Sequence, residues 1–488
     1  MVVVLAVGVA ALLLLRGGGT DDSTFGPVIE FDPARLSEIR LTSPDTVPER
    51  ILRTPDGEWR YQDPETGWAI NPERLRAALE LVREAKGEST TKPDPGFTPA
   101  RTVIFVLEGG REIAVDLPAT TLAGRATMRV SEYDSTPTIV GDGTQQGKPV
   151  KVAVQRSSPT RMVVGDGVFL AIFRAGLGEW RDPRLFPGLG PDVSRITLDA
   201  GETCVVLTRT RSAWALVEPV RVPASVPAVE RLLATLAALH STRFIPEGDL
   251  TASQTGLDAP AGIIEVVLAR RTQTDGGIMS EDVTSRLRLG SATDLLGDGR
   301  FAEIERGGRH LVVTSRSILE RLVITPTEYI SRRTLHVARA DVAGLSLLPA
   351  EDTTPLGADA RPAFIRTRDR WSARTEDAPP VPLNDEQARA VADLLSELCE
   401  ADAAAIRLAR PASYMPMARV LVFDAAGSPL EDFELAVSRG DGSEGGIADR
   451  WVLTTKLGGV YRLYSPGAGA KGLEWVRSIV PRAPPSPP

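Results

Sequence analysis

The chain repeats one pattern of apolar and polar positions three times. An apolar run leads into an Arg and Thr pair, a short polar turn and a single Trp, at Ile51–Trp59, Val206–Trp214 and Phe364–Trp371. The run and the turn predict a β-hairpin in each copy. The three tryptophans lie about 155 residues apart, which is too long for a solenoid repeat and close to the length of a domain. The pattern therefore predicts three related modules in tandem.

A short alternating strand precedes each hairpin, and an amphipathic helix follows it. The opening strands are expected at Leu36–Leu41, Val193–Leu198 and Val342–Leu347. Asn71 and Asn384 are good N-cap residues for the first and third helices, Pro72 suits the first helical position, and the second helix is expected from about Pro227. The apolar faces of the three helices are expected at Leu75, Leu79 and Val82; at Leu232, Leu233, Leu236 and Leu239; and at Val391, Leu394, Leu395 and Leu398.

More strands follow each helix. The first set is Thr102–Leu107, Ile263–Leu268 and Arg419–Phe423, and second strands are expected around Ile113, Leu287 and Leu435. Each module closes on a Glu followed by an aromatic residue, at Glu179-Trp180, Glu328-Tyr329 and Glu474-Trp475. Strands on both sides of one helix predict an α+β fold, in which each module is a largely antiparallel sheet with a packed helix.

The repeated Trp has two interpretations. It fills the space between hairpin and helix, where its large area dominates local burial, or it is a platform on which sugars stack. One Trp in each module, next to an apolar strand, favours packing in the core.

The N-terminus is a second strong signal. Met1–Leu15 is an unbroken apolar run, followed by Arg16 and a Gly-rich polar stretch. At about 1.5 Å per residue it spans roughly 22 Å, short of the roughly 30 Å hydrocarbon core. We favour a single membrane anchor over a cleaved signal peptide, because no basic segment precedes the run and no small-x-small cleavage site follows it. Arg16 taken alone would place the body in the cytoplasm, so charge does not fix the orientation.

These signals predict the following organisation. The segments are 1–16 membrane anchor, 17–30 linker, 31–187 module 1, 188–338 module 2, 339–480 module 3 and 481–488 a Pro-rich disordered tail.

Composition and charge exclude some functions. The hydrophobic content of 42% and charged content of 25% are typical of a globular protein. The net charge of −8 argues against a nucleic-acid-binding protein, which needs a basic face. The two cysteines, Cys204 and Cys399, fall at non-equivalent places in different modules, so we expect buried free thiols and not a disulfide.

No motif for catalysis, metal or cofactor binding stands out. The three histidines are His240 at a helix end, His310 in a turn and His336 in the junction before module 3, and none has metal spacing. Gly143–Lys148 only resembles a phosphate loop, because Pro149 stands where Ser or Thr should follow the Lys, so a plain loop is expected. Asp424–Asp432 and Asp441–Glu444 lack the spacing of a calcium loop. A pair of catalytic carboxylates of the glycosidase kind stays open, since their separation depends on the fold.

The arrangement resembles the bacterial family of domains of unknown function numbered 4340. The resemblance rests on Ile196-Thr-Leu198, Arg209–Trp214, Leu232–Leu236 and Gly256-Leu-Asp-Ala-Pro260. Module 2 carries it best. In the same place as the last element, module 1 has Gly96-Phe-Thr-Pro99 and module 3 the looser Ser413-Tyr-Met-Pro416. Short motifs in one shared order extend it over most of residues 35–480.

The resemblance implies a protein held in the plasma (inner) membrane by an N-terminal helix, with its body outside the cytoplasm. Members are associated with ABC-type transport systems, including those of gliding motility, and the family supplies no catalytic residues. We therefore expect a non-enzymatic auxiliary or scaffolding subunit, whose partners include the permease and ATPase subunits of such a complex. The alternatives are an extracytoplasmic enzyme acting on envelope polysaccharide and an envelope module that binds polysaccharide.

Overall fold

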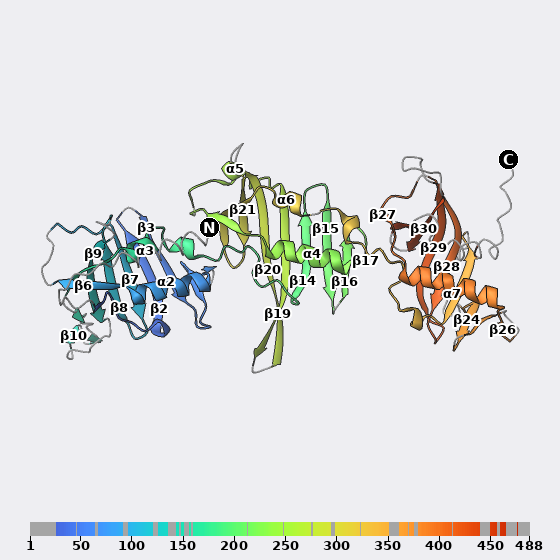
Figure 1. Cartoon of the computed structure of the whole chain (residues 1–488), viewed down its shortest axis with the longest axis horizontal. Helices are drawn as coiled ribbons and strands as arrows, with labels where there is room; N and C mark the ends of the chain where they lie inside the picture. The colour runs from blue at the N-terminus through green and yellow to red at the C-terminus, as the bar shows by residue number, and fades with distance from the viewer. Residues whose placement is uncertain are drawn as a thin grey trace, which may run out of the picture. The chain divides into compact units, whose positions relative to one another are not determined.

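The computed structural model describes most of the chain between residues 26 and 476 (Figure 1). The described residues are 26–44, 46–63, 67–90, 96–120, 125–134, 143–145, 148–150, 156–157, 160–211, 213–246, 248–274, 277–293, 298–322, 324–350, 361–368, 370–374, 379–411, 413–439, 449–455, 459–464 and 476. They form three large, antiparallel sheets with few helices, which is the expected α+β class. The chain divides into two compact units: Met1–Pro183 with Arg306–Arg309, and Arg184–Glu305 with His310–Pro488.

The first sheet belongs to the first unit. From edge to edge it runs β5 (Trp68–Ala69), β4 (Trp59–Tyr61), β3 (Thr46–Arg53), β2 (Leu36–Ser43), β7 (Arg101–Leu107), β8 (Arg111–Leu117), β9 (Arg125–Asp134), β13 (Arg161–Asp166), β6 (Lys86–Thr90) and β1 (Gly26–Pro27), with β12 (Arg156–Ser157) paired to β9. Apart from it, β10 (Gly143–Gln145) and β11 (Lys148–Val150) form a two-stranded hairpin.

The second unit contains the other two sheets. The second sheet runs β17 (Val222–Pro223), β16 (Ala213–Glu218), β15 (Cys204–Thr210), β14 (Val193–Asp199), β19 (Gly262–Thr274), β20 (Gly277–Ala292), β21 (Gly299–Glu305), β22 (Arg309–Ser315) and β18 (Ser241–Phe244). The third runs β26 (Val381–Pro382), β25 (Arg370–Ala373), β24 (Phe364–Thr367), β23 (Gly344–Pro349), β28 (Tyr414–Phe423), β29 (Pro429–Arg439), β30 (Asp449–Thr455), β31 (Tyr461–Leu463) and β27 (Ala405–Arg407).

The three sheets share one strand order. In each, four consecutive strands form a meander, a helix follows, the next strand pairs near the opposite edge, and a second meander fills the middle. The crossing helices are α2 (Pro72–Glu84), α4 (Val226–Ala237) and α7 (Asp385–Glu400), which lie across their sheets in Figure 1. The helix connects the two edges and covers one face of each sheet.

The caps and apolar faces of the helices follow the sequence closely. The Asn71 side chain accepts hydrogen bonds from the N–H groups of Glu73 and Arg74, and Asn384 forms a reciprocal capping box with Gln387. The buried helix residues are Leu75, Ala78, Leu79 and Val82; Ala228, Val229, Leu232 and Leu236; and Val391, Leu394, Leu395, Leu398 and Cys399. In the second module Leu233 is only half-buried, and Leu239 lies beyond the end of α4.

The remaining helices are short. They are α3 (Val168–Phe173), α5 (Ala252–Thr255) and α6 (Ile318–Arg321), with 3₁₀ turns η1 (Pro33–Arg35), η2 (Leu177–Trp180), η3 (Pro326–Tyr329) and η4 (Arg339–Asp341). In the first unit, Phe105 packs against Phe169 and Phe173 of α3, with ring centroids 6.3 and 6.0 Å apart.

Three local expectations need correction. The linker does not extend to residue 30, because Gly26–Pro27 pairs with β6 and the side chains of Val28 and Ile29 are buried in the first core. Gly143–Lys148 is not a plain loop, because β10 and β11 pair across it, with Thr144 opposite Pro149. His310 lies in strand β22, since the turn ends at Gly308.

The anchor predicted for residues 1–16 and the tail predicted for 481–488 lie outside the described residues. Among the helices of the described part, none has both the length and the apolar character needed to cross a membrane. The boundaries proposed for the three modules stay a prediction.

Candidate binding faces

The repeated Arg and Trp face each other in all three sheets. Arg53 is the cross-strand partner of Trp59, Arg209 that of Trp214, and Arg366 that of Trp371. Opposed residues of neighbouring strands project from the same face of a sheet. The motif that the sequence repeats is thus one cross-strand pair at the same place in each sheet.

The three arginines also make the same hydrogen bond. Each guanidinium donates to the backbone carbonyl two residues before a buried apolar residue at the module's start, which is Leu36, Val193 or Val342. The distances are 2.7 Å from Arg53 to Ala34, 2.8 Å from Arg209 to Pro191 and 2.6 Å from Arg366 to Ala340. Such charge-assisted bonds are stronger than neutral ones. The repeated Arg therefore links the segment just before each opening strand to the hairpin that contains the Trp.

The tryptophans are structural in at least two modules. Trp214 is 8% exposed and Trp371 6% exposed, whereas Trp59 is half-buried and packs against the first core. Their backbone carbonyls accept hydrogen bonds from residues just before the helix, at 2.8 Å from Ile70, 2.9 Å from Ala224 and 3.0 Å from Leu383. Burial confirms core packing for Trp214 and Trp371. Their ring faces are not accessible for stacking with a sugar.

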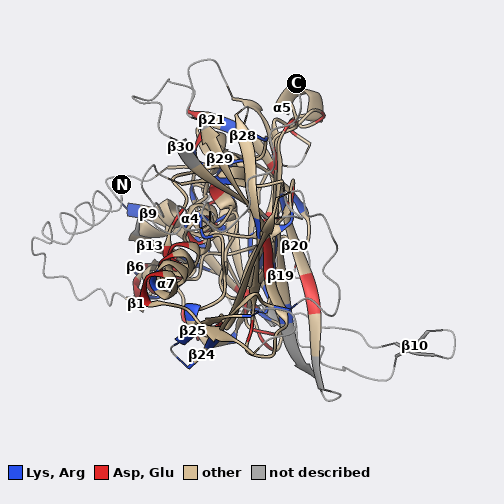
Figure 2. Ribbon diagram, turned by 90° about the vertical axis from the view of Figure 1, so that its right-hand side faces the viewer, with Lys and Arg blue, Asp and Glu red and all other residues tan. Residues whose placement is uncertain are grey.

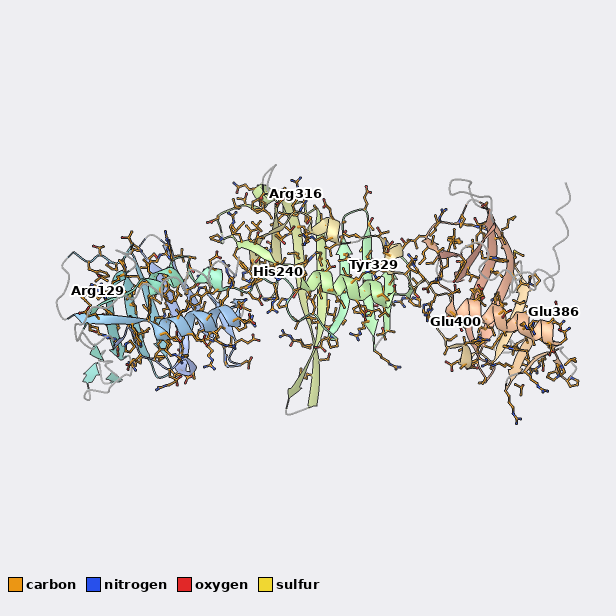
Figure 3. All side chains as sticks on the ribbon, viewed as in Figure 1. Arg129, His240, Arg316, Tyr329, Glu386 and Glu400 are labelled. Carbon is orange, nitrogen blue, oxygen red and sulfur yellow. The ribbon has the colours of Figure 1, made fainter. Side chains whose placement is uncertain are left out.

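The aromatic residues at the ends of the first two modules accept hydrogen bonds from the N-cap residues of the crossing helices. The N–H of Asn71 donates to the carbonyl of Trp180 at 2.8 Å, and the N–H of Ser225 donates to the carbonyl of Tyr329 at 2.7 Å. Trp180 is 7% and Tyr329 3% exposed, and Figure 3 shows where Tyr329 lies in the second module. Burial raises the pKa of Tyr329 to about 12. The third counterpart, Glu474-Trp475, lies outside the described residues.

The face of the first sheet opposite α2 carries a grid of side chains that are mostly polar and partly exposed. Strand alternation places Val103, Phe105 and their neighbours in the core with α2 and the intervening residues on the other face. The register aligns three rows across β2, β7, β8 and β9: Thr42, Thr102, Asp116 and Arg129; Arg40, Ile104, Ala114 and Ser131; and Glu38, Val106, Glu112 and Tyr133.

Ion pairs link the rows of this grid. Arg40 contacts Glu38 at 2.9 Å and Glu112 at 3.2 Å. The hydrogen bond from Arg40 to Glu38, together with both negative charges, raises the pKa of this guanidinium. Asp116 accepts from Thr102 at 2.6 Å and pairs with Arg129 at 2.6 Å. Each of these carboxylates is therefore paired with an arginine.

The second sheet has an ion pair at the position of Asp116 and Arg129, with the acid and the base exchanged. Arg288 on β20 and Glu303 on β21 are direct cross-strand partners joined at 2.9 Å. They occupy the strands that correspond to those of Asp116 and Arg129. The same scaffold position thus presents opposite charge patterns in two modules, which suits recognition of different surfaces.

In the third sheet the central ion pair on the second face is buried. Arg419 is 5% exposed and forms a bidentate pair with Asp432, at 3.0 and 2.7 Å. Ser346 is 3% exposed and bonds to the backbone of Arg361 and Ala363. Segment 361–363 therefore covers this part of the sheet.

Beside the covered part of the third sheet lies an aromatic pair. The rings of Tyr414 and Tyr461 are 5.4 Å apart, and Arg410 lies 4.5 Å from the ring of Tyr414. Tyr414 donates a hydrogen bond to Glu434. Burial, together with this bond, raises the pKa of Tyr414. Both tyrosines are partly exposed.

The residues considered for chemistry in the sequence are not brought together. Both cysteines are free, as expected, but Cys204 is partly exposed and only Cys399 is buried. Desolvation raises the pKa of each thiol, which disfavours the reactive thiolate. His240 lies just beyond α4 (Figure 3), and desolvation and nearby arginines lower the pKa of His336.

The acidic segments are turns where they are described. Asp424 accepts hydrogen bonds from the N–H groups of Ala426 and Ser428 and so closes the β28–β29 turn. Asp441–Glu444 lies outside the described residues. Within the described ranges, no group of three His, Cys, Asp or Glu side chains has the geometry of a metal site.

Comparison with known proteins gives one finding. The model of the family "Domain of unknown function (DUF4340)" matches residues 214–417, from the second module's Trp into β28 of the third sheet. The match supports the resemblance, over less of the chain than the expected 35–480. No curated protein shows a significant match.

Proposed function

We propose that the chain is a non-enzymatic, membrane-anchored protein whose body lies outside the cytoplasm. In this proposal three tandem copies of one module follow an N-terminal transmembrane helix in the plasma membrane. The protein acts as an auxiliary or scaffolding subunit of an ABC-type transport or gliding-related envelope complex, and binds the permease and ATPase subunits directly or through the complex.

The observation that carries the proposal is the recurrence of one sheet with one helix-covered face. The repeated Arg and Trp are used to build this sheet, since they pair across a hairpin and fasten the module's entry. What varies between modules is the second face, as the exchanged Asp116–Arg129 and Arg288–Glu303 pairs show. A constant frame with a variable polar face is typical of a binding protein. The association with transport systems comes from the family resemblance alone, because the family that matches residues 214–417 is described only as a domain of unknown function.

Site-specific photocrosslinking in native membranes tests this assignment. A photoreactive residue at Ile104 or Val267 samples the face of the first sheet opposite α2 or the face of the second sheet opposite α4, and both side chains are half-buried. Glu80 of α2 and Glu230 of α4 are exposed on the covering helices and serve as matched controls. We expect permease crosslinks from the two sheet positions and few from the controls. Equal crosslinking from all four positions, or none to a transporter subunit, would contradict the proposal.

A second candidate is an envelope protein that binds or processes polysaccharide. The observation in its favour is the half-exposed Tyr414–Tyr461 pair with Arg410 and Glu434 beside it, because sugars bind to aromatic rings flanked by polar groups. Binding of solubilised envelope polysaccharide to the full chain, lost in Tyr461→Ala and retained in Trp59→Ala, would favour this candidate over the first.

A further inference from the structure

The hairpin between β19 and β20 extends far beyond the sheet that contains it (Figure 1). Its ladder is continuous from Gly262 opposite Leu289 to Thr274 opposite Gly277. The neighbouring strand β14 pairs with β19 only as far as Leu268. On the other side, β21 pairs with β20 from Arg286 onwards, where Arg286 lies opposite Glu305.

The N–H of Ala269 still donates to the carbonyl of Asp192 at 2.8 Å. The last five pairs of the ladder, from Arg270 opposite Glu281 to Thr274 opposite Gly277, form a two-stranded ribbon. We call this ribbon together with the pair at its base, residues 269–282, the arm. At about 3.3 Å per residue the arm is roughly 20 Å long. The corresponding hairpins of the other sheets close at once, through the turns at Glu108–Gly110 and Asp424–Ser428. The arm is therefore an addition to the second module and not a requirement of the fold.

An isolated two-stranded ribbon is marginally stable in water and exposes unpaired backbone groups along both edges. Met279 of the arm is 62% exposed, one of the most exposed large apolar side chains in the described part of the chain. Ser280, Glu281 and Asp282 are also exposed. A ribbon of this kind gains most from a further strand along an edge.

The two edges of the arm carry opposite charge. On the β19 side the arm sequence is Ala-Arg-Arg-Thr-Gln-Thr, with Arg270 and Arg271 and no acid. On the β20 side it is Gly-Ile-Met-Ser-Glu-Asp, with Glu281 and Asp282 and no base. Figure 2 shows acidic residues on the projecting part of this hairpin. A twofold pairing of like edges brings equal charges together, whereas the β19 edge of one arm complements the β20 edge of another.

We propose that the arm pairs head to tail with the arm of a second copy of this chain. The β20 edge of one copy receives the β19 edge of the next, which continues the antiparallel ribbon and places Arg270 beside Glu281 of the neighbouring copy. One ribbon edge buries little surface, so association is weak in dilute solution. It becomes effective when copies share one membrane, because confinement raises their effective concentration.

Cysteine crosslinking of the full chain tests the geometry. In a Cys204→Ser background, Arg270→Cys and Glu281→Cys are made in two chains with tags of different size and mixed in detergent micelles. Under oxidation, mixed 270–281 dimers are expected in several-fold excess over either self-crosslink. Glu202→Cys, exposed in a turn of the same module, is the control and is expected to crosslink no better than the background. Self-crosslinks that equal the mixed product, or no crosslink above this control, would overturn the proposal.

Charge exchange separates arm pairing from a general loss of structure. Changing both arginines of the arm to Glu makes both edges acidic, and the crosslink yield between such copies is expected to fall at least about tenfold. Changing the two acids to Lys as well restores complementarity and is expected to restore the yield. A further variant replaces residues 269–282 with Glu-Gly-Gly, the turn of the first module, and is expected to keep its circular dichroism and lose self-association. Unchanged self-association of this variant in lipid vesicles, where copies share one membrane, would contradict the inference.

Discussion

Replacing the third repeated tryptophan, Trp371→Ala, is expected to destabilise the third sheet strongly and locally. The side chain is 6% exposed and belongs to the core cluster that includes Val391 and Leu394 of α7. A Trp of this kind buries about 200 Å². At roughly 25 cal/mol per Å², the burial contributes about 5 kcal/mol, an upper estimate. Core Trp→Ala changes cost about 3–5 kcal/mol, so we expect a loss of that size.

Hydrogen exchange of the full chain, followed by mass spectrometry, measures this effect in the module where it occurs. A loss of about 3 kcal/mol accelerates exchange through global opening of the module by roughly a hundredfold. The acceleration is expected for amides of α7 and β28, and not for those of α2 in the first unit. Val381→Ala, on the neighbouring edge strand and 61% exposed, is the control and is expected to change the free energy of unfolding by less than about 0.5 kcal/mol.

The half-buried Trp59 provides a graded comparison. Trp59→Ala is expected to cost less free energy of unfolding than Trp371→Ala, because less of its ring leaves water on folding. Unchanged exchange of the α7 amides in Trp371→Ala would refute the assignment of the repeated Trp to the core. An equal loss of stability in Val381→Ala would refute the burial argument itself.

Three further predictions follow from individual contacts. Asn384→Ala removes a capping box and should lower the urea stability of the third module by about 1 kcal/mol, without effect on the first. Asp432→Ala leaves the buried Arg419 without its bidentate partner and should cost about 3 kcal/mol in urea unfolding, whereas Arg419→Met combined with Asp432→Leu should recover much of this loss. The pKa of Tyr329 is raised above that of an unfolded tyrosine, so its contribution to stability is complete below about pH 10 and is lost as the pH rises towards 12. The free energy of unfolding should therefore fall less steeply with pH between about pH 10 and 12 in Tyr329→Phe than in the unchanged chain. Alkaline unfolding followed by tyrosinate absorbance measures this, and identical pH profiles of the two proteins would contradict the raised pKa of Tyr329.

The elements that the sequence predicted best are those whose signal is local. Asn71 and Asn384 begin helices because their side chains satisfy free backbone N–H groups, which depends on neighbouring residues alone. The alternation in Val193–Leu198 likewise reflects burial of one face, and β14 covers this range.

The elements missed by sequence reasoning depend on contacts between distant residues. Strand β6, Lys-Gly-Glu-Ser-Thr, has no apolar alternation, and it becomes a strand because β13 and β1 pair with it. Val28 and Ile29 follow a polar stretch, and only the fold buries them. The polar sequence of the arm likewise gives no strand signal, since its ladder pairs residues within a hairpin and not against a core.

The candidate faces were beyond prediction for a similar reason. The pairing of Asp116 with Arg129 depends on the register of β8 and β9, which no local pattern specifies. The bond from Arg209 to Pro191 joins residues on either side of the opening strand. The sequence shows that Arg and Trp repeat. Only the pairing of the strands shows that they are cross-strand partners and that the Arg bonds to the segment before the opening strand.

Affinity purification of the tagged full chain from native membranes tests the central claim, that this protein is a subunit of a membrane transport complex, most directly. The membranes are solubilised in mild detergent, and the co-purified proteins are quantified against the tagged chain by mass spectrometry. The account predicts permease and ATPase subunits in near-stoichiometric yield, and their loss when the chain begins at residue 17, without the expected anchor. Recovery of the protein without transporter subunits, under conditions in which the permease and ATPase purify together, would contradict it.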